Sequence, residues 1–344
     1  MGVNLKDLVP RRTMSLEELN GRSVAVDAYN ALYQFLSIIR QPTGELLTDR
    51  QGRVTSHLSG ILYRNSNLAE KGVKIVYVFD GKPPSLKSME TERRRRVKEK
   101  ASIHYKEAIK RGDMEEARMY AQMTSKLKDS MVDDAKRLLT LLGIPWVQAP
   151  SEGEAQAAYL TQKGTVWATA SQDYDSLLFG APRLVRNLSI TGKRKLPRKN
   201  IYVEVTPELI EQELVLNELG VTLEQLIDIG ILVGTDFNPD GAHGVGAKTA
   251  FKLMKEHGRL EKIAPQLREK GLPEDLSAIK QIFLNPNVSD DYRVEWNPPD
   301  IEGTVRFLCG ERDFSEERTR NALGKMSRSF QETKAKRTLD RWFS

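Results

Sequence analysis

Three short apolar runs, each followed by an aspartate, constrain the fold of this chain most strongly. They cover residues 23–26, 74–79 and 165–169 and are rich in β-branched and aromatic residues. Helical patterns separate them, so we expect buried strands that alternate with helices. Such alternation predicts an α/β fold in which helices flank a mostly parallel central sheet.

Predicted helices cover about 131–142, a stretch that begins at Ser151, and about 223–233. The first of these ends at Gly143 with Pro145 just beyond it, which is typical of a helix C-terminus. Residues 181–204 are predicted to form strands and turns on a basic surface.

The aspartates stand where a sheet of this kind binds its ligands. Asp27 follows the first run, Asp80 follows the second, and Asp173 and Asp175 come a few residues after the third. In open α/β sheets, ligands bind beyond the carboxyl ends of the strands. Three parallel strands would therefore bring these carboxylates to one rim.

Three further carboxylates extend the set. Glu152 and Glu154 lie at the start of a predicted helix, and Asp236 follows the helix predicted at 223–233. Like charges raise one another's pKa, so such a cluster favours divalent cations with oxygen ligands, Mg²⁺ or Mn²⁺. Two such ions can activate water and stabilise a leaving oxygen in phosphodiester hydrolysis. We therefore predict a two-ion site.

A structural interpretation of the same residues stays open at this point. An aspartate after a strand is often a turn residue or a helix cap. Ser151 and Glu154 also have the spacing of a capping box, in which the Glu154 side chain would accept a hydrogen bond from the first residue of the helix and would bind no metal ion.

Residues 82–111 form a strongly basic segment with eleven Lys or Arg and four Glu. Within it, residues 93–96 are four consecutive arginines, which would point all around a helix and leave no apolar side. The segment is therefore either an exposed charged helix or a basic passage for single-stranded DNA.

The turn at 244–249 resembles a phosphate-binding loop, but Ala247 separates Gly246 from Lys248, where that motif requires Gly-Lys. We therefore exclude a nucleoside triphosphatase. A glycine turn that leads into a helix can still present N–H groups to a DNA phosphate, which makes Gly244, Gly246 and Lys248 candidate duplex contacts. A glycine-rich turn without a ligand is the alternative.

Several classes of protein are excluded by composition. The chain has 344 residues, a net charge of +6, four histidines and one cysteine, Cys309. No intrachain disulfide is possible, and no Cys/His cluster has zinc-site spacing. No apolar run approaches the length of a membrane span, and the N-terminus lacks a signal-peptide core. We expect an intracellular protein of the cytoplasm or nucleoid.

Four long runs closely resemble the flap endonucleases of the XPG/Rad2 structure-specific nuclease family, in their archaeal form. The runs are VFDGKPPSLK, APSEGEAQAAYL, SQDYDSLLFGAPRLVRN and GTDFNPDGAHGVGAKTA, and the resemblance covers nearly the whole chain. It implies a PIN-like nuclease fold with a helical arch and a helix-turn-helix element that binds duplex DNA. It also implies a 5′ flap endonuclease with 5′–3′ exonuclease activity, active in Okazaki fragment maturation and base excision repair.

The resemblance assigns roles to individual residues. The family's ligands for two Mg²⁺ ions, which Mn²⁺ can replace, match Asp27, Asp80, Glu152, Glu154, Asp173, Asp175 and Asp236. Residues that contact the scissile phosphate match Lys87 and Arg94, and further DNA contacts match Tyr33, Arg40 and Arg64. Thr55 matches a residue of a pocket for a 3′ flap, Gly2 lies near the site in the family, and a K⁺ ion is often held at the helix-turn-helix element.

The predicted organisation is one nuclease domain over 1–326 and a flexible tail over 327–344. The domain comprises an N-region at about 1–98, an arch at about 82–130, an I-region at about 116–258 and a helix-hairpin element at about 236–258. In the tail, Leu339, Trp342 and Phe343 resemble the motif that binds the DNA sliding clamp (PCNA), with Lys336 at the usual glutamine position. A frayed terminus with incidental apolar residues is the alternative. We expect a monomer.

Two other functions compete with this hypothesis. The first is an inert protein that marks DNA junctions, which the complete carboxylate set argues against. The second is a related nuclease for excision repair or processive exonuclease work. Such relatives carry a large central insertion or a long C-terminal extension, and this sequence has neither.

Overall fold

The computed structural model describes residues 2–41, 43–124, 126–188, 192–195 and 202–343. Within them the main sheet has seven strands in the order β1-β9-β6-β5-β2-β3-β4. The parallel strands are β2 (Ser23–Asp27), β3 (Lys74–Phe79), β4 (Trp146–Gln148), β5 (Ala168–Ala170) and β6 (Arg183–Arg186). β9 (Glu208–Glu211) and β1 (Arg12–Thr13) extend the sheet antiparallel at one edge, and β7 (Gly192–Lys195) pairs with β8 (Tyr202–Val205) in a separate hairpin. The prediction of a mostly parallel sheet is confirmed.

The first two predicted strands are correct, but the third begins later than expected. β5 covers Ala168–Ala170, so residues 165–167 precede it rather than belong to it. The sequence interpretation gave weight to the larger side chains of Val166 and Trp167. The ladder instead contains small buried residues, which fit between the neighbouring strands β2 and β6.

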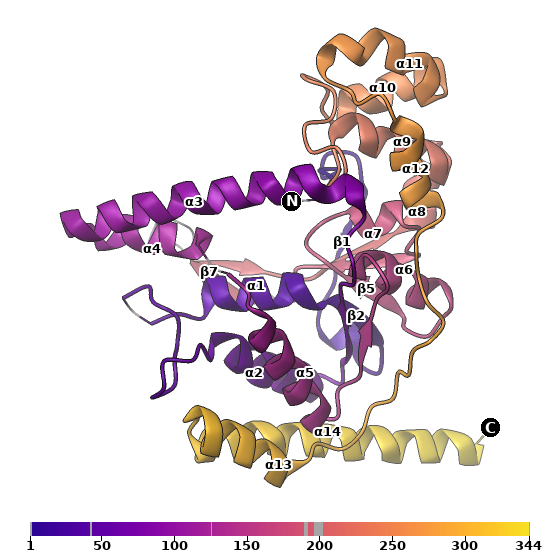
Figure 1. The fold of residues 1–344 in the computed structure, drawn as a ribbon. Helices are drawn as coiled ribbons and strands as arrows, with labels where there is room; N and C mark the ends of the chain where they lie inside the picture. Colours follow the sequence, from indigo (N-terminus) through magenta and orange to yellow (C-terminus); the bar gives the residue numbers. More distant parts are fainter. Residues whose placement is uncertain (1, 42, 125, 189–191, 196–201, 344) are drawn as a thin grey trace.

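Helices cover both faces of the sheet (Figure 1). On one side lie α1 (Ala28–Ile38), α2 (Ser56–Glu70), α5 (Asp129–Leu141), α13 (Ile301–Val305) and α14 (Glu316–Phe343), and they share one apolar core with β2 and β3. A second core joins α7 (Asp175–Leu178), α8 (Gln212–Leu219), α9 (Leu223–Val233), α10 (Ala247–His257), α11 (Leu260–Leu267) and α12 (Leu276–Leu284). α6 (Gly153–Gln162) packs against the sheet between them. The helices predicted near 131–142 and 223–233 are confirmed, whereas the one predicted from Ser151 begins at Gly153.

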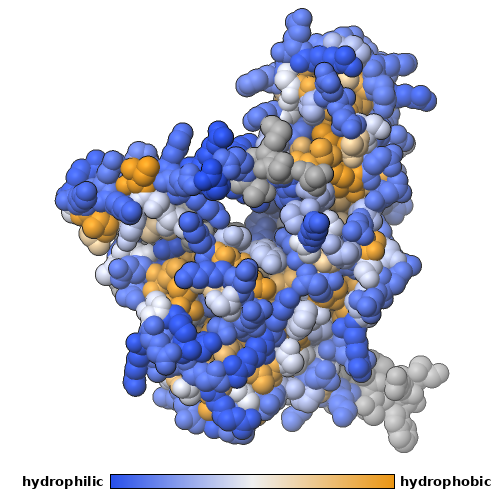
Figure 2. Space-filling view, viewed as in Figure 1, coloured by the Kyte–Doolittle hydropathy of each residue, from blue (hydrophilic) through white to orange (hydrophobic). Residues whose placement is uncertain are grey.

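The basic segment and the residues that follow it form two helices that stand away from the body of the molecule (Figure 1). α3 (Ser88–Arg111) ends at Gly112, whose left-handed backbone (φ +72°) stops the helix, and α4 (Met114–Met123) packs back along it. Arg95 and Arg96 of α3 face solvent, whereas Arg94 turns toward the sheet rim. Figure 2 shows hydrophilic side chains over α3 and a hollow beneath it.

The C-terminal segment, for which we predicted a flexible tail, lies within a long helix, and its flexibility stays a prediction. α14 continues through residue 343 without interruption. Its first half is anchored, because Leu323 and Met326 are buried against the core and Lys325 forms an ion pair with Glu70 of α2. The remaining residues include many good helix formers, which extend a helix once it has been nucleated by packing.

In the described part of the chain, no helix combines the length and apolar character needed to cross a membrane.

Candidate active site

The predicted strand-end aspartates meet at one rim of the sheet. β2 lies between β5 and β3, and all three run in the same direction. Asp27 ends β2 opposite Val78, two residues before Asp80. Asp173 and Asp175 follow β5 on the other side of β2. The chain adds strands first on one side of β2 and later on the other, which is the topological switch point where α/β sheets bind ligands.

The start of α6 is tied to this rim by hydrogen bonds. The backbone N–H of Gly153 donates to Oδ1 of Asp80 at 2.6 Å, which places Glu152 and Glu154 beside the aspartates. The hydroxyl of Ser151 donates to the carbonyl of Lys82, so it does not cap α6. Glu154 accepts a 2.7 Å hydrogen bond from Ser171. The capping-box interpretation of Glu154 is therefore wrong.

The N-terminus closes one side of the cluster. The backbone N–H of Val3 donates to Oδ1 of Asp175 at 2.7 Å. A Cβ atom at Gly2 would lie 2.4 Å from Oδ2 of Asp175 and 2.7 Å from Cβ of Asp173. Only glycine fits at this position without displacing those side chains, as expected for a terminus packed against the site.

Two cations from the base of the arch lie among the carboxylates. Nζ of Lys87 is 2.5 Å from Oε2 of Glu152 and 3.3 Å from Oδ2 of Asp236. Arg94 donates to both carboxylate oxygens of Asp236, at 2.8 and 2.9 Å, and to Glu90 at 2.7 Å. These contacts join α3 to the sheet rim and to the loop after α9.

Burial makes the carboxylates costly to ionise. Burial, and then repulsion from Asp80, raise the pKa of Asp27 to about 8. Burial, and then repulsion from Asp236, raise the pKa of Asp175 to about 7, and burial with the charge of Asp175 raises the pKa of Glu154 well above its usual range. Such a set is stabilised by a cation.

The donor chemistry fits divalent ions, because every side chain of the cluster offers hard oxygen atoms. Among the described residues, no group of three His, Cys, Asp or Glu side chains is arranged to hold a metal as it stands. Glu152 and Asp236 turn instead toward Lys87 and Arg94. These side chains would need to rotate toward an ion.

The predicted DNA contacts near the arch lie in different environments. Tyr33 of α1 is 36% exposed, and the ammonium of Lys98 lies 4.4 Å from its ring centre. Arg40 donates to the carbonyls of Ser37 and Gly44 and so supports the turn after α1. Arg64 is half-buried and lines a small cavity behind the cluster together with Asp27.

Thr55 is buried and lines a groove of about 560 Å³ between α1, α2 and residues 312–318.

On the other side of the molecule, Gly246 precedes α10, and Gly244 has a left-handed backbone (φ +77°). Both glycines have open space where a Cβ would lie. Lys248 is exposed in the first turn of α10. The side chains of Leu339, Trp342 and Phe343 lie outside the described part of the structure.

Sequence reasoning missed the role of Glu90. This residue is only 4% exposed, and its carboxylate contacts the guanidinium groups of Arg94 and Arg93. It orients the arginine that reaches Asp236. The signal was present as the i,i+4 spacing of Glu90 and Arg94 on one helix.

Comparisons with known proteins agree with this geometry. Residues 1–101 match the XPG N-terminal domain, and residues 143–236 match the XPG I-region. Flap endonuclease 1 of Staphylothermus marinus is 54% identical over 350 residues, and that of Pyrococcus abyssi is 56% identical over 343 residues. These alignments cover all of this chain and at least 98% of each relative. The chain belongs to the flap endonuclease family.

Solved structures support the same assignment. The flap endonuclease-1 from Methanococcus jannaschii is 44% identical in sequence and matches with a TM-score of 0.76. The alignment covers 96% of this chain and 99% of that one. The catalytic core of Rad2 in complex with DNA substrate matches with a TM-score of 0.67 over 92% of this chain and 96% of that one. At 23% identity, that likeness shows the shared fold alone.

Membership of this flap endonuclease family settles the class of enzyme. The chain is a structure-specific nuclease that hydrolyses DNA at flaps, with a role in replication and repair. Flap endonucleases of this family depend on a metal ion, generally Mg²⁺. The PIN-like fold predicted from the sequence is confirmed.

Proposed function

We propose that this chain removes 5′ flaps by two-metal-ion hydrolysis at the carboxylate cluster. The observation that carries the proposal is the position of Lys87 and Arg94, both in contact with Asp236 at the sheet rim. Two Mg²⁺ ions, which Mn²⁺ can replace, would supply an activated water and a Lewis acid for the scissile phosphate. The ligands would be Asp27, Asp80, Glu152, Glu154, Asp173, Asp175 and Asp236.

When the carboxylates bind the metal ions, Lys87 and Arg94 become available to contact the phosphate of the substrate. Burial lowers the pKa of Lys87, but Glu152 and Asp236 raise it by more, so the amine stays charged. An ammonium and a guanidinium at this place stabilise the negative charge that develops on the phosphate. Glu90 keeps Arg94 in position.

The arch gives the site its preference for single strands. α3 and α4 extend above the rim, and α3 carries a dense set of Lys and Arg side chains, so a 5′ single strand can pass beneath them along its phosphates. Tyr33 stacks on a base near the cut. Arg40 and Arg64 contribute positive charge from below, and the groove that contains Thr55 accepts a short 3′ flap.

The duplex behind the cut binds at the glycine turn before α10. Gly244 and Gly246 present backbone N–H groups to a phosphate, and Lys248 adds a cation. Backbone carbonyls of this turn would hold a K⁺ ion. Lys248→Ala should weaken duplex binding equally for all DNA sequences. The slope of the logarithm of the binding constant against the logarithm of the salt concentration should fall by about one, as expected when one phosphate contact is lost. An unchanged salt dependence would count against this contact.

The direct test uses a labelled double-flap substrate, a plain duplex and a single strand of the same sequence. With Mg²⁺ we expect cleavage near the junction of the double flap and far slower cleavage of the other two substrates. EDTA should stop cleavage. Equal rates on all three substrates, or cleavage that survives EDTA, would refute the proposal.

A further inference from the structure

An extended strap, residues 285–300, connects the helices on the duplex side of the molecule to α13. It leaves α12 at Leu284, passes α6 and reaches α13 at Ile301 (Figure 1). The described residues of the strap form neither helix nor strand. Its first part moves with the duplex-binding helices, because α12 packs on α9 and α9 packs on α10, which follows the glycine turn.

Gln156 of α6 holds the beginning of this strap. The side chain is fully buried, and its Oε1 accepts a 2.8 Å hydrogen bond from the backbone N–H of Ser289. Its Nε2 donates to the backbone carbonyl of the same residue, also at 2.8 Å. The donor and the acceptor of the amide thus meet an acceptor and a donor of one residue, which fixes its orientation. Breaking this pair would leave buried polar groups without partners.

The same turn of α6 is attached to the carboxylate cluster. The backbone N–H of Gln156 donates to the carbonyl of Glu152 at 3.2 Å, and Glu154 lies two residues before Gln156. Gly153 of this turn donates to Asp80. The beginning of α6 therefore joins the strap to the residues that would bind the metal ions.

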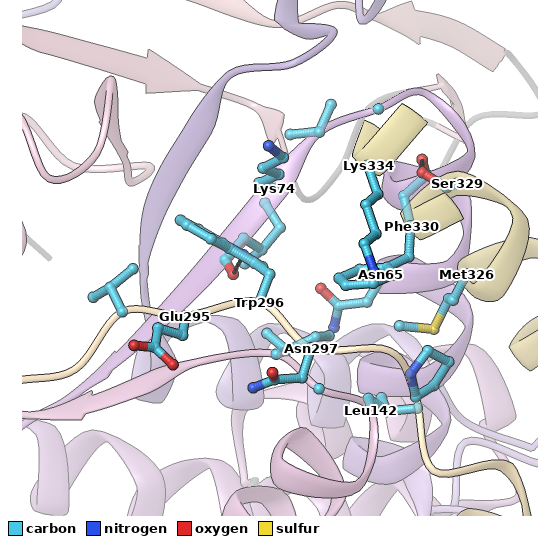
Figure 3. A pocket seen from close by; sticks show the side chains of 18 residues that line it. Asn65, Lys74, Leu142, Glu295, Trp296, Asn297, Met326, Ser329, Phe330 and Lys334 are labelled. Carbon is cyan, nitrogen blue, oxygen red and sulfur yellow. Dashed lines mark hydrogen bonds between the residues drawn. The ribbon is translucent and has the colours of Figure 1, made fainter. Parts of the chain in front are cut away.

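Further contacts hold the rest of the strap against the sheet. The hydroxyl of Tyr159, also on α6, donates to the carboxylate of Asp290 at 2.8 Å. The indole N–H of Trp296 donates to the carbonyl of Ile75 at 2.9 Å. Figure 3 shows Trp296 beside Lys74 at the start of β3. With its far end held in this way, the strap is fixed both near the duplex-binding helices and on the sheet.

The distance between the duplex contact and the metal ions decides which phosphodiester is cut. Successive phosphates of one strand are about 3.4 Å apart along a DNA duplex. A displacement of the duplex-binding helices by that distance would bring the neighbouring phosphate to the ions. Cleavage at one defined position therefore needs a rigid connection between the two sites.

We propose that Gln156 is a positioning residue that sets the incision position by fixing the strap to the first turn of α6. It touches neither the DNA nor the metal ions and acts through Ser289. This role depends on the duplex contact proposed above for the glycine turn.

The test maps the products of single-turnover cleavage of a labelled double flap at single-nucleotide resolution. We compare wild type with Gln156→Leu at equal extents of reaction. The ratio of the main product to the products one nucleotide away should fall about tenfold, as expected from the loss of two hydrogen bonds. An enzyme that is merely less stable would cut less DNA at an unchanged position.

The control is Gln162→Leu on the same helix. Nε2 of Gln162 donates to the carbonyls of Phe179 and Gly180 at 2.9 and 3.0 Å, away from the strap. This variant also loses two hydrogen bonds and should keep the wild-type product ratio. An unchanged ratio in folded Gln156→Leu, or an equal change in Gln162→Leu, would overturn the proposal.

Tyr159→Phe provides a second test if Gln156→Leu does not fold. It removes only the exposed bond to Asp290 and should change the product ratio about twofold in the same direction, whereas an unchanged ratio would overturn the proposal. Lys248→Ala separates this role from the duplex contact itself. Duplex binding unchanged by Lys248→Ala would remove the duplex contact, and the role of Gln156 with it. Weakened binding by Lys248→Ala, together with unchanged incision by Gln156→Leu, would overturn the role of Gln156 alone.

Discussion

The ammonium group of Lys87 lies 2.5 Å from the carboxylate of Glu152, although 65 residues separate them in the chain. Lys87 immediately precedes α3, and Glu152 immediately precedes α6. This pair joins the basic arch to the acidic rim of the sheet. It places the cation that would bind a phosphate next to the carboxylates that would bind metal ions.

Replacing Lys87 by methionine should slow single-turnover cleavage by roughly a hundredfold to a thousandfold, the usual cost of losing one group that stabilises a developing oxyanion. Flap binding should change little, because many other cations contact the backbone. Lys87→Arg should recover part of the rate. The control is Lys71→Met, whose exposed side chain forms an ion pair with Glu17 outside the site. A Lys87→Met rate within twofold of wild type would contradict this role.

Gly2→Ala tests the contact between the N-terminus and the cluster. The added methyl group would overlap Oδ2 of Asp175, so that side chain must shift. Displacement of a metal ligand by about 1 Å should lower the cleavage rate roughly tenfold to a hundredfold. Part of this loss should be recovered by raising the Mg²⁺ concentration. The control is Asn4→Ala, at an exposed position nearby, which should cleave at the wild-type rate. A wild-type cleavage rate for Gly2→Ala would contradict the packing of Gly2 against Asp175.

The arch should become more ordered when a flap is bound. We expect trypsin to cut between residues 93 and 111 in the free enzyme and to cut there much more slowly with a 5′ flap substrate. A plain duplex of equal length should give little protection, because it has no single strand beneath α3. The exposed Lys262 of α11 serves as an internal reference site. Equal cleavage of the arch with and without the flap would show that the strand does not engage it.

The C-terminal motif should act through a sliding clamp and not through the active site. Deletion of residues 336–344 should abolish stimulation by the clamp and leave basal cleavage unchanged. Lys336→Gln restores the usual glutamine and should strengthen clamp binding severalfold, since a polar contact is regained. Stimulation that survives the deletion would place the clamp contact elsewhere.

The strand-end aspartates could be predicted because their positions depend on local rules. An apolar run forms a strand, and parallel strands deliver the residues that follow them to one rim. These two rules were sufficient to predict the positions of Asp27 and Asp80. The start of β5 was misplaced, because a run of small residues carries less signal than the neighbouring Val166 and Trp167.

Other features depend on contacts between distant segments, which spacing does not reveal. The bond between Val3 and Asp175 crosses 172 residues, and Arg94 reaches Asp236 across 142 residues. The helical course of α14 was missed because its polar composition suggested a tail. Its packing on α2 comes from a few buried residues, including Leu323.

The central claim is that the carboxylate cluster cuts the flap and does not hold the DNA. The most direct test compares wild type with Asp173→Ala for Mg²⁺-dependent single-turnover cleavage and for binding of the same double flap. Asp291→Ala, an exposed carboxylate outside the site, is the control. We predict a loss of cleavage of about a thousandfold or more, with binding within about twofold of wild type. Cleavage retained by Asp173→Ala, or binding lost together with it, would contradict the account.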